Sequence, residues 1–436
     1  MTAQLGLFGC VSVDLFAGGG GASLGILRAT GRAPSVAINH DPAAIQMHAA
    51  NHPGTLHLCE SVFDVAPFLP RGRAIDLLWL SPDCTHHSRA KGGKPLKNDR
   101  RGLAGIGIVW AKAVRPRVIA LENVPEFADW GPLYPDDHEV EALRNRPIPE
   151  RRGESFRAWV GELEALGYHV EWRCLVAADY GAPTTRKRLF LIARCDGRPI
   201  VWPEPTHGKG RPQAWRTAAE CIDWSIPCPS IFERRKPLAE ATQRRIAEGL
   251  RRYVLTSARP FLVCLTHGGR LECLDQPHRT ITTANGGERA LVAPTLIQTG
   301  YGERKGQAPR ALDLGGGRGG GHFGLVAAFL LKYYGSGGQW SGLPEPMHSI
   351  VTKARMGLVT VDLNGEEYAI ADIGLRMLAP RELARAQGFG DDYLLTGSKA
   401  EQIARIGNSA PPHVVEALVR AQFSGARDPV AVGMVA

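Results

Sequence analysis

Residues 11–27, VSVDLFAGGGGASLGIL, decide the fold that we expect for this chain of 436 residues. The first six predict a short parallel strand, and the glycine-rich run after them predicts a turn that opens a helix. Glycines at such a turn let a ligand approach the backbone closely. A second strand over 35–38 ends on polar residues 39–41, whose side chains suit ribose hydroxyls. We therefore expect an open α/β sheet that binds a nucleoside-bearing cofactor, with a merely tight strand-to-helix turn as the alternative.

A cysteine follows a third apolar segment. Residues 74–79 run into LSPDCT, residues 80–85, and a further apolar run over 118–121 leads into Glu122. Open α/β sheets place their chemistry at the carboxyl ends of such strands. A thiolate from Cys84 and an acid at a neighbouring strand end suit attack on an electron-poor ring that is protonated as it is attacked, and cytosine is such a ring.

Two other interpretations of Cys84 stay open at this point. A cysteine is often a small buried apolar residue, although the polar neighbours of Cys84 favour a loop. Cys84, His86 and His87 could be metal ligands, but no second ligand pair with the spacing of a zinc finger follows.

Six motifs resemble those of the DNA cytosine-5 methyltransferases of prokaryotes and phages, which use S-adenosylmethionine. The resemblance extends over residues 10–195 and 371–423. In chain order the motifs are Asp14–Gly20, Pro82–Cys84, Glu122–Val124, Tyr180–Arg188, Arg376–Tyr393 and Ile406–Pro412. Six motifs in this order are not expected by chance.

The resemblance implies a doubly wound, Rossmann-like α/β methyltransferase domain that binds S-adenosylmethionine. The family usually has an acidic residue where Asn39 stands. Ser61 aligns with its usual adenine-contacting Asp, with Asp64 as a rival candidate. The cofactor-binding residues that the resemblance implies are Asp14, Phe16, Ala17, Gly18, Gly20, Asn39, His40, Asp41, Ser61, Asp64, Pro82, Asn408 and Ser409.

The resemblance also implies catalytic roles. Cys84 attacks C6 of cytosine, while Glu122 donates a hydrogen bond or proton at N3, so that C5 takes the methyl group. Arg186 and Arg188 hold the base O2 and help to fix the loop; the alternative is two solvated arginines. The sequence names no base for removal of the C5 proton, and we expect a water molecule in that role.

Attack at C6 requires that the base be flipped out of the duplex. The basic, glycine-bearing segment over 88–101 is expected to close over double-stranded DNA, although a solvated loop would have a similar composition. The DNA-binding residues expected there are Ser88, Arg89, Lys91, Lys94 and Arg101.

Three residues depart from the family pattern. Asp83 stands where a proline usually precedes the cysteine, and Thr85 and Thr184 replace glutamines. The nucleophile, the acid and the arginines are intact. Two rival functions remain: RNA cytosine methylation, of transfer RNA for example, and a catalytically silent DNA-binding protein. The long inserted segment argues against the first, and the retention of both Cys84 and Glu122 argues against the second.

The charge distribution indicates where DNA binds. The net charge is +9 with an isoelectric point near 9.2, which fits a polyanionic partner. Residues 205–370 contain about 21 Lys and Arg against about 14 Asp and Glu, and their short strands with Gly and Pro turns predict a β-rich target-recognition lobe. We expect domains at 1–204 and 205–370, with 371–436 returning to the catalytic domain.

The composition also suggests a location. Nine cysteines without regular spacing suggest reduced thiols, and we expect no secretory signal and no membrane span. These features predict a cytoplasmic enzyme, monomeric by the family's default. No nuclease motif is present, so a cognate restriction endonuclease would be a separate partner.

Overall fold

The computed structural model describes most of the first half of the chain and its C-terminal part. The residues that it describes are 9–82, 104–135, 137–238, 242, 246, 261–264, 271–280, 289–298, 311–313, 329–332, 340–342, 356–358, 360–363 and 366–424. The chain divides into two compact units. The first comprises Met1–Arg216, Pro277–Thr283 and Leu383–Ala436, and the second comprises Thr217–Gln276 and Ala284–Glu382.

The first unit is built on a sheet of seven described strands. These are β1 (Ser12–Leu15), β2 (Val36–Ile38), β3 (Leu56–Leu58), β4 (Leu77–Leu80), β5 (Val118–Asn123), β6 (His169–Val176) and β7 (Lys187–Arg194). Their order is β3-β2-β1-β4-β5-β7-β6. Strands β1 to β5 pair in parallel, whereas β7 pairs antiparallel with both β5 and β6. The predicted doubly wound α/β fold is confirmed.

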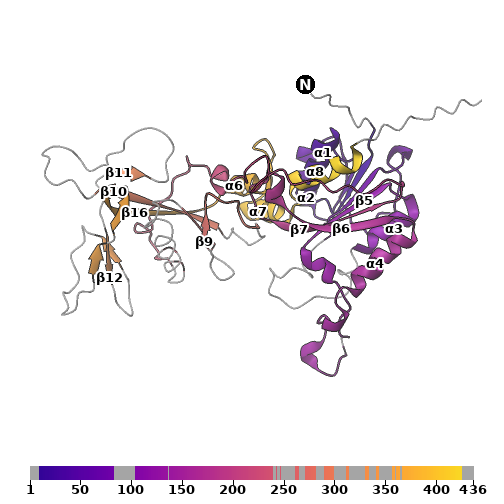
Figure 1. Cartoon of the computed structure of the whole chain (residues 1–436), viewed down its shortest axis with the longest axis horizontal. Helices are drawn as coiled ribbons and strands as arrows, with labels where there is room; N and C mark the ends of the chain where they lie inside the picture. The colour runs from indigo at the N-terminus through magenta and orange to yellow at the C-terminus, as the bar shows by residue number, and fades with distance from the viewer. Residues whose placement is uncertain are drawn as a thin grey trace, which may run out of the picture. The chain divides into compact units, whose positions relative to one another are not determined.

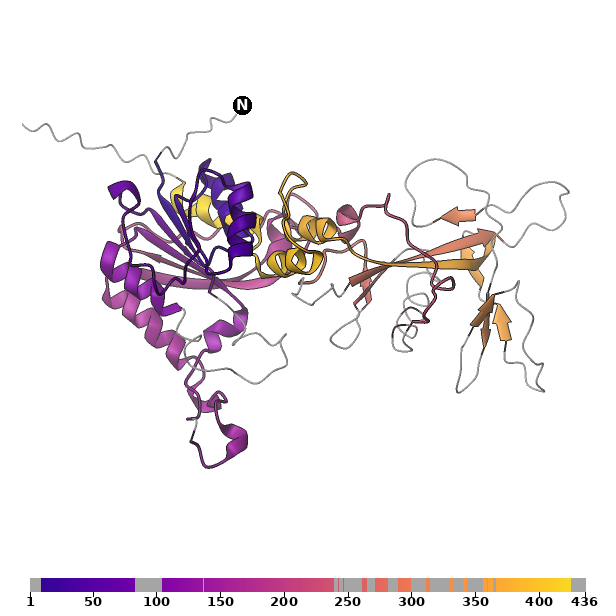
Figure 2. The ribbon, with the colours of Figure 1, turned by 180° about the vertical axis from the view of Figure 1, so that it is seen from behind.

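Helices cover both faces of this sheet (Figures 1 and 2). The side chains of α3 and α4 join one buried apolar cluster, and those of α1 and α8 join the other. The C-terminal helix α8 packs beside α1. The described helices are α1 (Gly21–Thr30), α2 (Pro42–Asn51), α3 (Gly105–Val114), α4 (Glu154–Ala165), α6 (Pro380–Gln387), α7 (Lys399–Asn408) and α8 (Pro412–Phe423).

The two clusters follow from the alternation of side chains along each strand. On β4, Leu78 and Leu80 enter the α3 and α4 cluster, while Leu77 and Trp79 enter the α1 and α8 cluster. A strand buried on both faces is apolar at successive positions, as parallel strands under two helix layers are. The continuous apolar runs of the sequence therefore become the central strands.

The second unit is β-rich, as expected for the inserted lobe. Its described strands form a sheet of order β15-β16-β10-β8-β9, with β11 beside β10, and a three-stranded sheet β13-β12-β14. All of the pairings between these strands are antiparallel. The bounds are β8 (Phe261–Cys264), β9 (Leu271–Cys273), β10 (Arg289–Gln298), β11 (Ala311–Asp313), β12 (Phe329–Lys332), β13 (Trp340–Gly342), β14 (Met356–Leu358), β15 (Thr360–Leu363) and β16 (Glu366–Met377).

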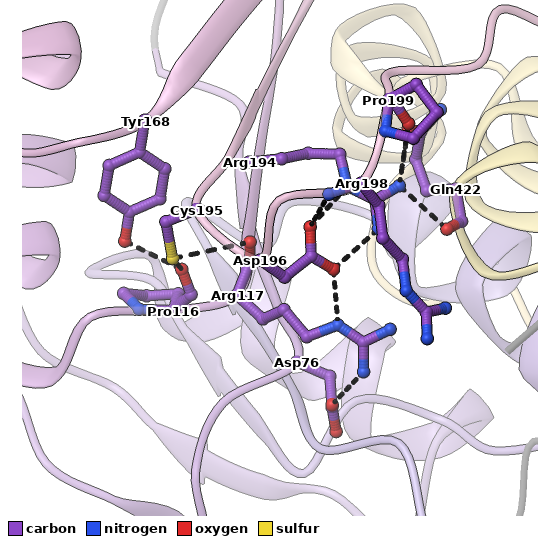
Figure 3. Close-up of polar contacts among 10 residues, drawn as sticks. All are labelled: Asp76, Pro116, Arg117, Tyr168, Arg194, Cys195, Asp196, Arg198, Pro199 and Gln422. Atoms are coloured by element: carbon purple, nitrogen blue, oxygen red, sulfur yellow. Dashed lines mark hydrogen bonds and ion pairs between the residues drawn. The ribbon is translucent and has the colours of Figure 1, made fainter. Parts of the chain in front are cut away.

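An ionic network lies at the edge of the first unit's sheet where β4 and β5 begin (Figure 3). Arg117 and Arg194 both donate to the Asp196 carboxylate, and Arg117 also contacts Asp76. Arg194 reaches further, to the backbone carbonyl of Gln422 in α8 at 2.9 Å. The network therefore joins residues at the ends of β4, β5 and β7 to the C-terminal helix. No helix within the described ranges is long and apolar enough to cross a membrane.

Candidate functional site

Two parallel strands end side by side at the predicted catalytic edge. Leu80 of β4 is in register with Leu121 of β5, so the residues that follow each strand are neighbours. The Asn123 side-chain amide donates to the carbonyl oxygen of Pro82 at 3.2 Å, and its own oxygen accepts from the Val124 amide at 2.8 Å. Asn123 thereby fixes the backbone from which the predicted cysteine loop departs.

The predicted acid and one predicted arginine form an ion pair at this edge. Nε of Arg188 lies 3.3 Å from Oε1 of Glu122, and both side chains are largely buried. Arg188 comes from the start of β7, which pairs with β5. A fixed positive charge thus stands beside the carboxyl group that is expected to face the cytosine ring.

Arg186 has a different environment. Its side chain is buried, and Nη1 donates to the carbonyl oxygen of Gly407, 3.0 Å away at the end of α7. Thr184, one of the three departures from the family pattern, is also buried; its hydroxyl accepts from the Arg186 amide and donates to the Arg279 carbonyl oxygen, each at 3.3 Å. The structure therefore joins two segments far apart in the chain through Arg186, whose predicted contact with the base stays a prediction.

The glycine-rich turn after β1 contains strained and tightly packed backbone. Phe16 has φ 64°, in the left-handed region that costs a non-glycine residue roughly 1–2 kcal/mol. A side chain at Gly20 would collide with the hydroxyl of Tyr393, and one at Gly21 would collide with the Ala410 carbonyl. Among the described residues nothing lies within 4 Å of where a Cβ of Gly18 would stand. The turn is thus packed on one side and open at Gly18.

The polar residues after β2 hold this turn. The Asn39 amide donates to the carbonyl oxygen of Ala17 at 3.1 Å, and its side-chain oxygen accepts from the Asp41 amide at 2.8 Å. Asp41 in turn caps α2 by accepting from the Ala43 amide at 3.0 Å, while His40 is exposed. A carboxylate at position 39 could not donate to Ala17, so the departure from the family pattern gives the turn a bond that an acidic residue would lack.

The remaining predicted cofactor residues come from β3 onward and from the C-terminal part of the chain. Ser61 accepts from the Phe63 amide through its hydroxyl and from the Asp64 amide through its carbonyl, and Asp64 is exposed. Asn408 is exposed at the end of α7, whereas Ser409 is buried and would lie 3.1 Å from a Cβ of Gly19. The structure therefore brings Ser409 against the glycine turn, although nearly 400 residues separate them in the sequence.

Asp14 is buried beneath the turn. Its Oδ2 accepts from the Ser23 hydroxyl at 2.6 Å, and its Oδ1 has no hydrogen-bond partner in the described part of the chain. Burial raises the pKa of Asp14 to about 7, against a lowering by the Ser23 hydrogen bond. The sequence predicted Asp14 but not its neighbours Ser23 and His48, which no local pattern distinguishes from ordinary helix residues. Tyr393 ends a predicted motif, but its position beside Asp14 was not predicted.

The remaining predicted residues lie outside the described residues. They are the nucleophile Cys84, its neighbours Asp83 and Thr85, and the DNA-binding candidates Ser88, Arg89, Lys91, Lys94 and Arg101. Of the described residues, no group of three or more His, Cys, Asp or Glu side chains could hold a metal ion.

The fold and the glycine turn define an α/β protein that binds a nucleoside-bearing cofactor. Residues 11–220 and 334–424 match the family described as C-5 cytosine-specific DNA methylase, and the chain belongs to this family. It is therefore a cytosine-5 methyltransferase, with S-adenosylmethionine as the methyl donor.

Individual relatives are more distant. The type II methyltransferase M1.HphI of Haemophilus parahaemolyticus is 23% identical over 415 residues, which cover 94% of this chain and 85% of that protein. M.NgoMIV of Neisseria gonorrhoeae is 33% identical over 199 residues, covering 44% of this chain and 55% of that protein. The solved structure of the Entamoeba histolytica methyltransferase EhMeth has a TM-score of 0.49 and 14% identity, covering 96% of this chain and 99% of that chain.

The described residues fit this cofactor. S-adenosylmethionine carries a positively charged sulfonium and an α-ammonium group. Oδ1 of Asp14, which has no hydrogen-bond partner among the described side chains and backbone, supplies a buried negative complement beside the turn. The open side at Gly18 lets a ligand approach the backbone. Asp14, Phe16 and Gly18 are the residues that would hold the cofactor on this side of the sheet.

Proposed function

We propose that the chain methylates C5 of cytosine within a short, specific sequence of double-stranded DNA. The observation that carries this proposal is the junction of the β4 and β5 ends. There Asn123 holds the Pro82 carbonyl at 3.2 Å, and the Glu122–Arg188 pair lies on the adjoining strands. This geometry supports a loop carrying Cys84 that departs next to the acid.

The proposed reaction passes through a covalent bond between the enzyme and the base. The Cys84 thiolate forms a bond to C6 while Glu122 hydrogen-bonds or protonates N3, and the displaced electron pair moves to C5. S-adenosylmethionine supplies the methyl group that C5 takes. A water molecule then removes the C5 proton, the bond between sulfur and C6 breaks to return the thiolate, and a proton taken up at N3 returns to Glu122. Arg188 supplies fixed positive charge beside Glu122 while the ring is electron-rich.

Specificity and partners belong to the same proposal. The target base is flipped from the duplex, at a cost of a few kcal/mol that protein contacts offset, with residues 88–101 closing over the DNA. The basic segment over 205–370, within which the described strands form antiparallel sheets, reads the sequence. The type II name of M1.HphI supports a link to a separate restriction endonuclease. We retain a cytoplasmic monomer as the expected state.

The test is transfer from S-adenosylmethionine with a labelled methyl group to unmethylated genomic DNA, followed by mapping of 5-methylcytosine at base resolution. We expect modification at one short recurring sequence, no transfer by Cys84→Ser, and normal transfer by Cys174→Ser, which changes an exposed cysteine on β6. Transfer to tRNA instead of DNA would establish the RNA alternative. If the wild-type protein binds DNA but transfers no methyl group to any nucleic acid, it is a catalytically silent DNA-binding protein. Full activity of Cys84→Ser would show that Cys84 is not the nucleophile.

A further inference from the structure

A chain of four hydrogen-bonded side chains runs from Asp14 beneath the cofactor turn to the edge of the sheet. Ser23 Oγ donates to Asp14 at 2.6 Å, Ser23 lies 2.8 Å from His48 Nε2, and His48 Nδ1 lies 2.8 Å from His57 Nε2. Asp14, Ser23 and His48 are fully buried, whereas His57 on the edge strand β3 is partly exposed. The chain therefore connects a buried carboxyl group to solvent.

When Asp14 is ionised, the three hydrogen bonds of this chain can have only one donor-to-acceptor direction. The only proton on Ser23 Oγ points to Asp14, so Ser23 accepts from His48 Nε2–H. His48 Nδ1 is then an acceptor, and it accepts a hydrogen bond from His57 Nε2–H. Reversing every bond accommodates a neutral Asp14 carboxyl group. The state with a neutral Asp14 holds one more proton than the state with an ionised Asp14. Changing from the first state to the second removes a proton from Asp14 at one end of the chain and releases one from Nδ1 of His57 at the other.

The groups around the chain are largely uncharged. His52 lies beside it, with its ring 4.6 Å from that of His48 and 6.1 Å from that of Tyr393. Tyr393 faces Asp14 and donates to the Gly19 carbonyl at 2.7 Å, and burial raises its pKa. The guanidinium of Arg405, whose Cβ lies near Gly19, binds the Thr396 carbonyl and Glu401.

Burial lowers the pKa of the three histidines in and beside this chain. It lowers the pKa of His48 well below the ordinary value and that of His52 to about 4, with the neighbouring histidines adding to the lowering. The pKa of His57 is lowered in the same direction, again by burial. All three rings are therefore neutral near pH 7, which leaves Asp14 as the group whose charge changes there.

We propose that Ser23, His48 and His57 are positioning residues that fix the Asp14 carboxylate and carry its proton to solvent, so that binding of cationic S-adenosylmethionine is coupled to proton release. The proton leaves the Asp14 carboxyl group for Ser23, Ser23 passes its own to His48, His48 passes one to His57, and His57 releases one to water. The proposal rests on cofactor binding and is independent of the nucleic acid that is methylated.

The test is titration calorimetry of the full chain with S-adenosylmethionine, without nucleic acid, at pH 6, 7 and 8 in two buffers of different ionisation enthalpy. If ionised Asp14 is required, the affinity rises roughly tenfold from pH 6 to pH 8, with a fraction of a proton released near pH 7. Ser23→Ala removes the donor to the carboxylate, so it is expected to move this rise to higher pH and to weaken binding at pH 7 by roughly 3- to 10-fold.

The control variant is Thr30→Val, which removes another buried hydroxyl from α1, one whose described partners are the Ile26 and Arg32 carbonyls and the Arg32 amide. It should keep the wild-type affinity and proton count, and the ligand's own titration is common to all variants. Asp14→Asn should bind weakly at every pH with no release beyond that of the ligand, and it carries the test if Ser23→Ala does not fold. A wild-type affinity independent of pH, or an unchanged profile in Ser23→Ala, would overturn the proposal. Failure of DNA methylation with this coupling intact would refute only the proposed substrate.

Discussion

Replacing Asp196 by Asn tests the ionic network opposite the catalytic edge (Figure 3). The Asp196 carboxylate accepts from Arg117 Nε at 2.9 Å and from Arg194 Nη2 at 2.7 Å through one oxygen, and from Arg194 Nε at 3.0 Å through the other. The Arg194 side chain is 2% exposed and that of Asp196 is 15% exposed. An amide in this position keeps the shape but loses the charge, so Arg194 would retain a buried charge without its counter-ion.

The pKa of Asp196 gives the magnitude. Burial alone raises this pKa, but hydrogen bonds from Arg194 and Arg117 outweigh burial and lower it from an ordinary 3.8 to about 2. At about 1.4 kcal/mol per pKa unit, the carboxylate contributes about 2.5 kcal/mol at neutral pH. Solvent screening of the partly exposed group reduces this to about 2 kcal/mol.

The sign of the pH dependence follows from the lowered pKa. The stabilisation is complete above the unfolded pKa near 4 and is lost as the pH falls through the folded pKa near 2, so roughly half remains at pH 3. Urea unfolding of wild type and Asp196→Asn at pH 7, 5 and 3 measures the difference. Glu164→Gln, an acid-to-amide change at an exposed site on α4, is the control. A loss at pH 7 no larger than that of the control, or a loss that does not shrink toward pH 3, would refute the reasoning.

Three further predictions concern the catalytic edge. Tyr393→Phe removes the 2.7 Å bond to Gly19 and should weaken S-adenosylmethionine binding by roughly 5- to 10-fold, about 1 kcal/mol, with KM affected more than kcat; equal binding by both forms in equilibrium dialysis would contradict this. Gly21→Ala places a methyl group against the Ala410 carbonyl and should cost about 1–3 kcal/mol of unfolding free energy. Gly161→Ala, at an exposed position of α4 where no described atom lies within 4 Å of the added Cβ, should not destabilise. Asn123→Ala frees the Pro82 carbonyl and should lower kcat by on the order of tenfold with cofactor affinity unchanged; a change confined to KM for the cofactor would show that Asn123 acts elsewhere.

Much of the first unit's sheet could be predicted because its central strands are buried on both faces. The apolar runs ending at Phe16, Ile38 and Leu121 became β1, β2 and β5. The run over 74–79 became β4, which begins only at Leu77. Asp76, the residue before β4, is not part of the strand, and its carboxylate accepts from the Val11 amide at 2.9 Å. Strand β3 has no continuous apolar run in the sequence, because it lies at the edge of the sheet, where Leu56 is exposed.

The site was predictable to the extent that it consists of motifs with a known order. Glu122 and Arg188 were expected to act on the same base, and the structure pairs them at 3.3 Å. The partners that hold the motifs in place were not predictable. Tyr393 meets Gly19 across a separation of 374 residues, and no local periodicity contains such a contact. Buried polar side chains are specified by the three-dimensional environment that satisfies them, and a single sequence does not display it.

The two ends of the central sheet differ in what their side chains do. At the carboxyl ends of the parallel strands, Phe16 is held in a strained conformation, and a buried oxygen of Asp14 has no partner among the described residues. Each of these raises the free energy of the folded chain. At the opposite edge, Asp196 is satisfied by two arginines that also tie α8 to the sheet. A binding edge leaves polar groups for its ligand to satisfy, whereas both oxygens of the Asp196 carboxylate at the opposite edge accept from arginine side chains. Bound cofactor should therefore stabilise the first unit mainly by contacting the buried Asp14 carboxyl group. Asp196→Asn should lower the stability of the unliganded chain but leave the stabilisation by the cofactor intact.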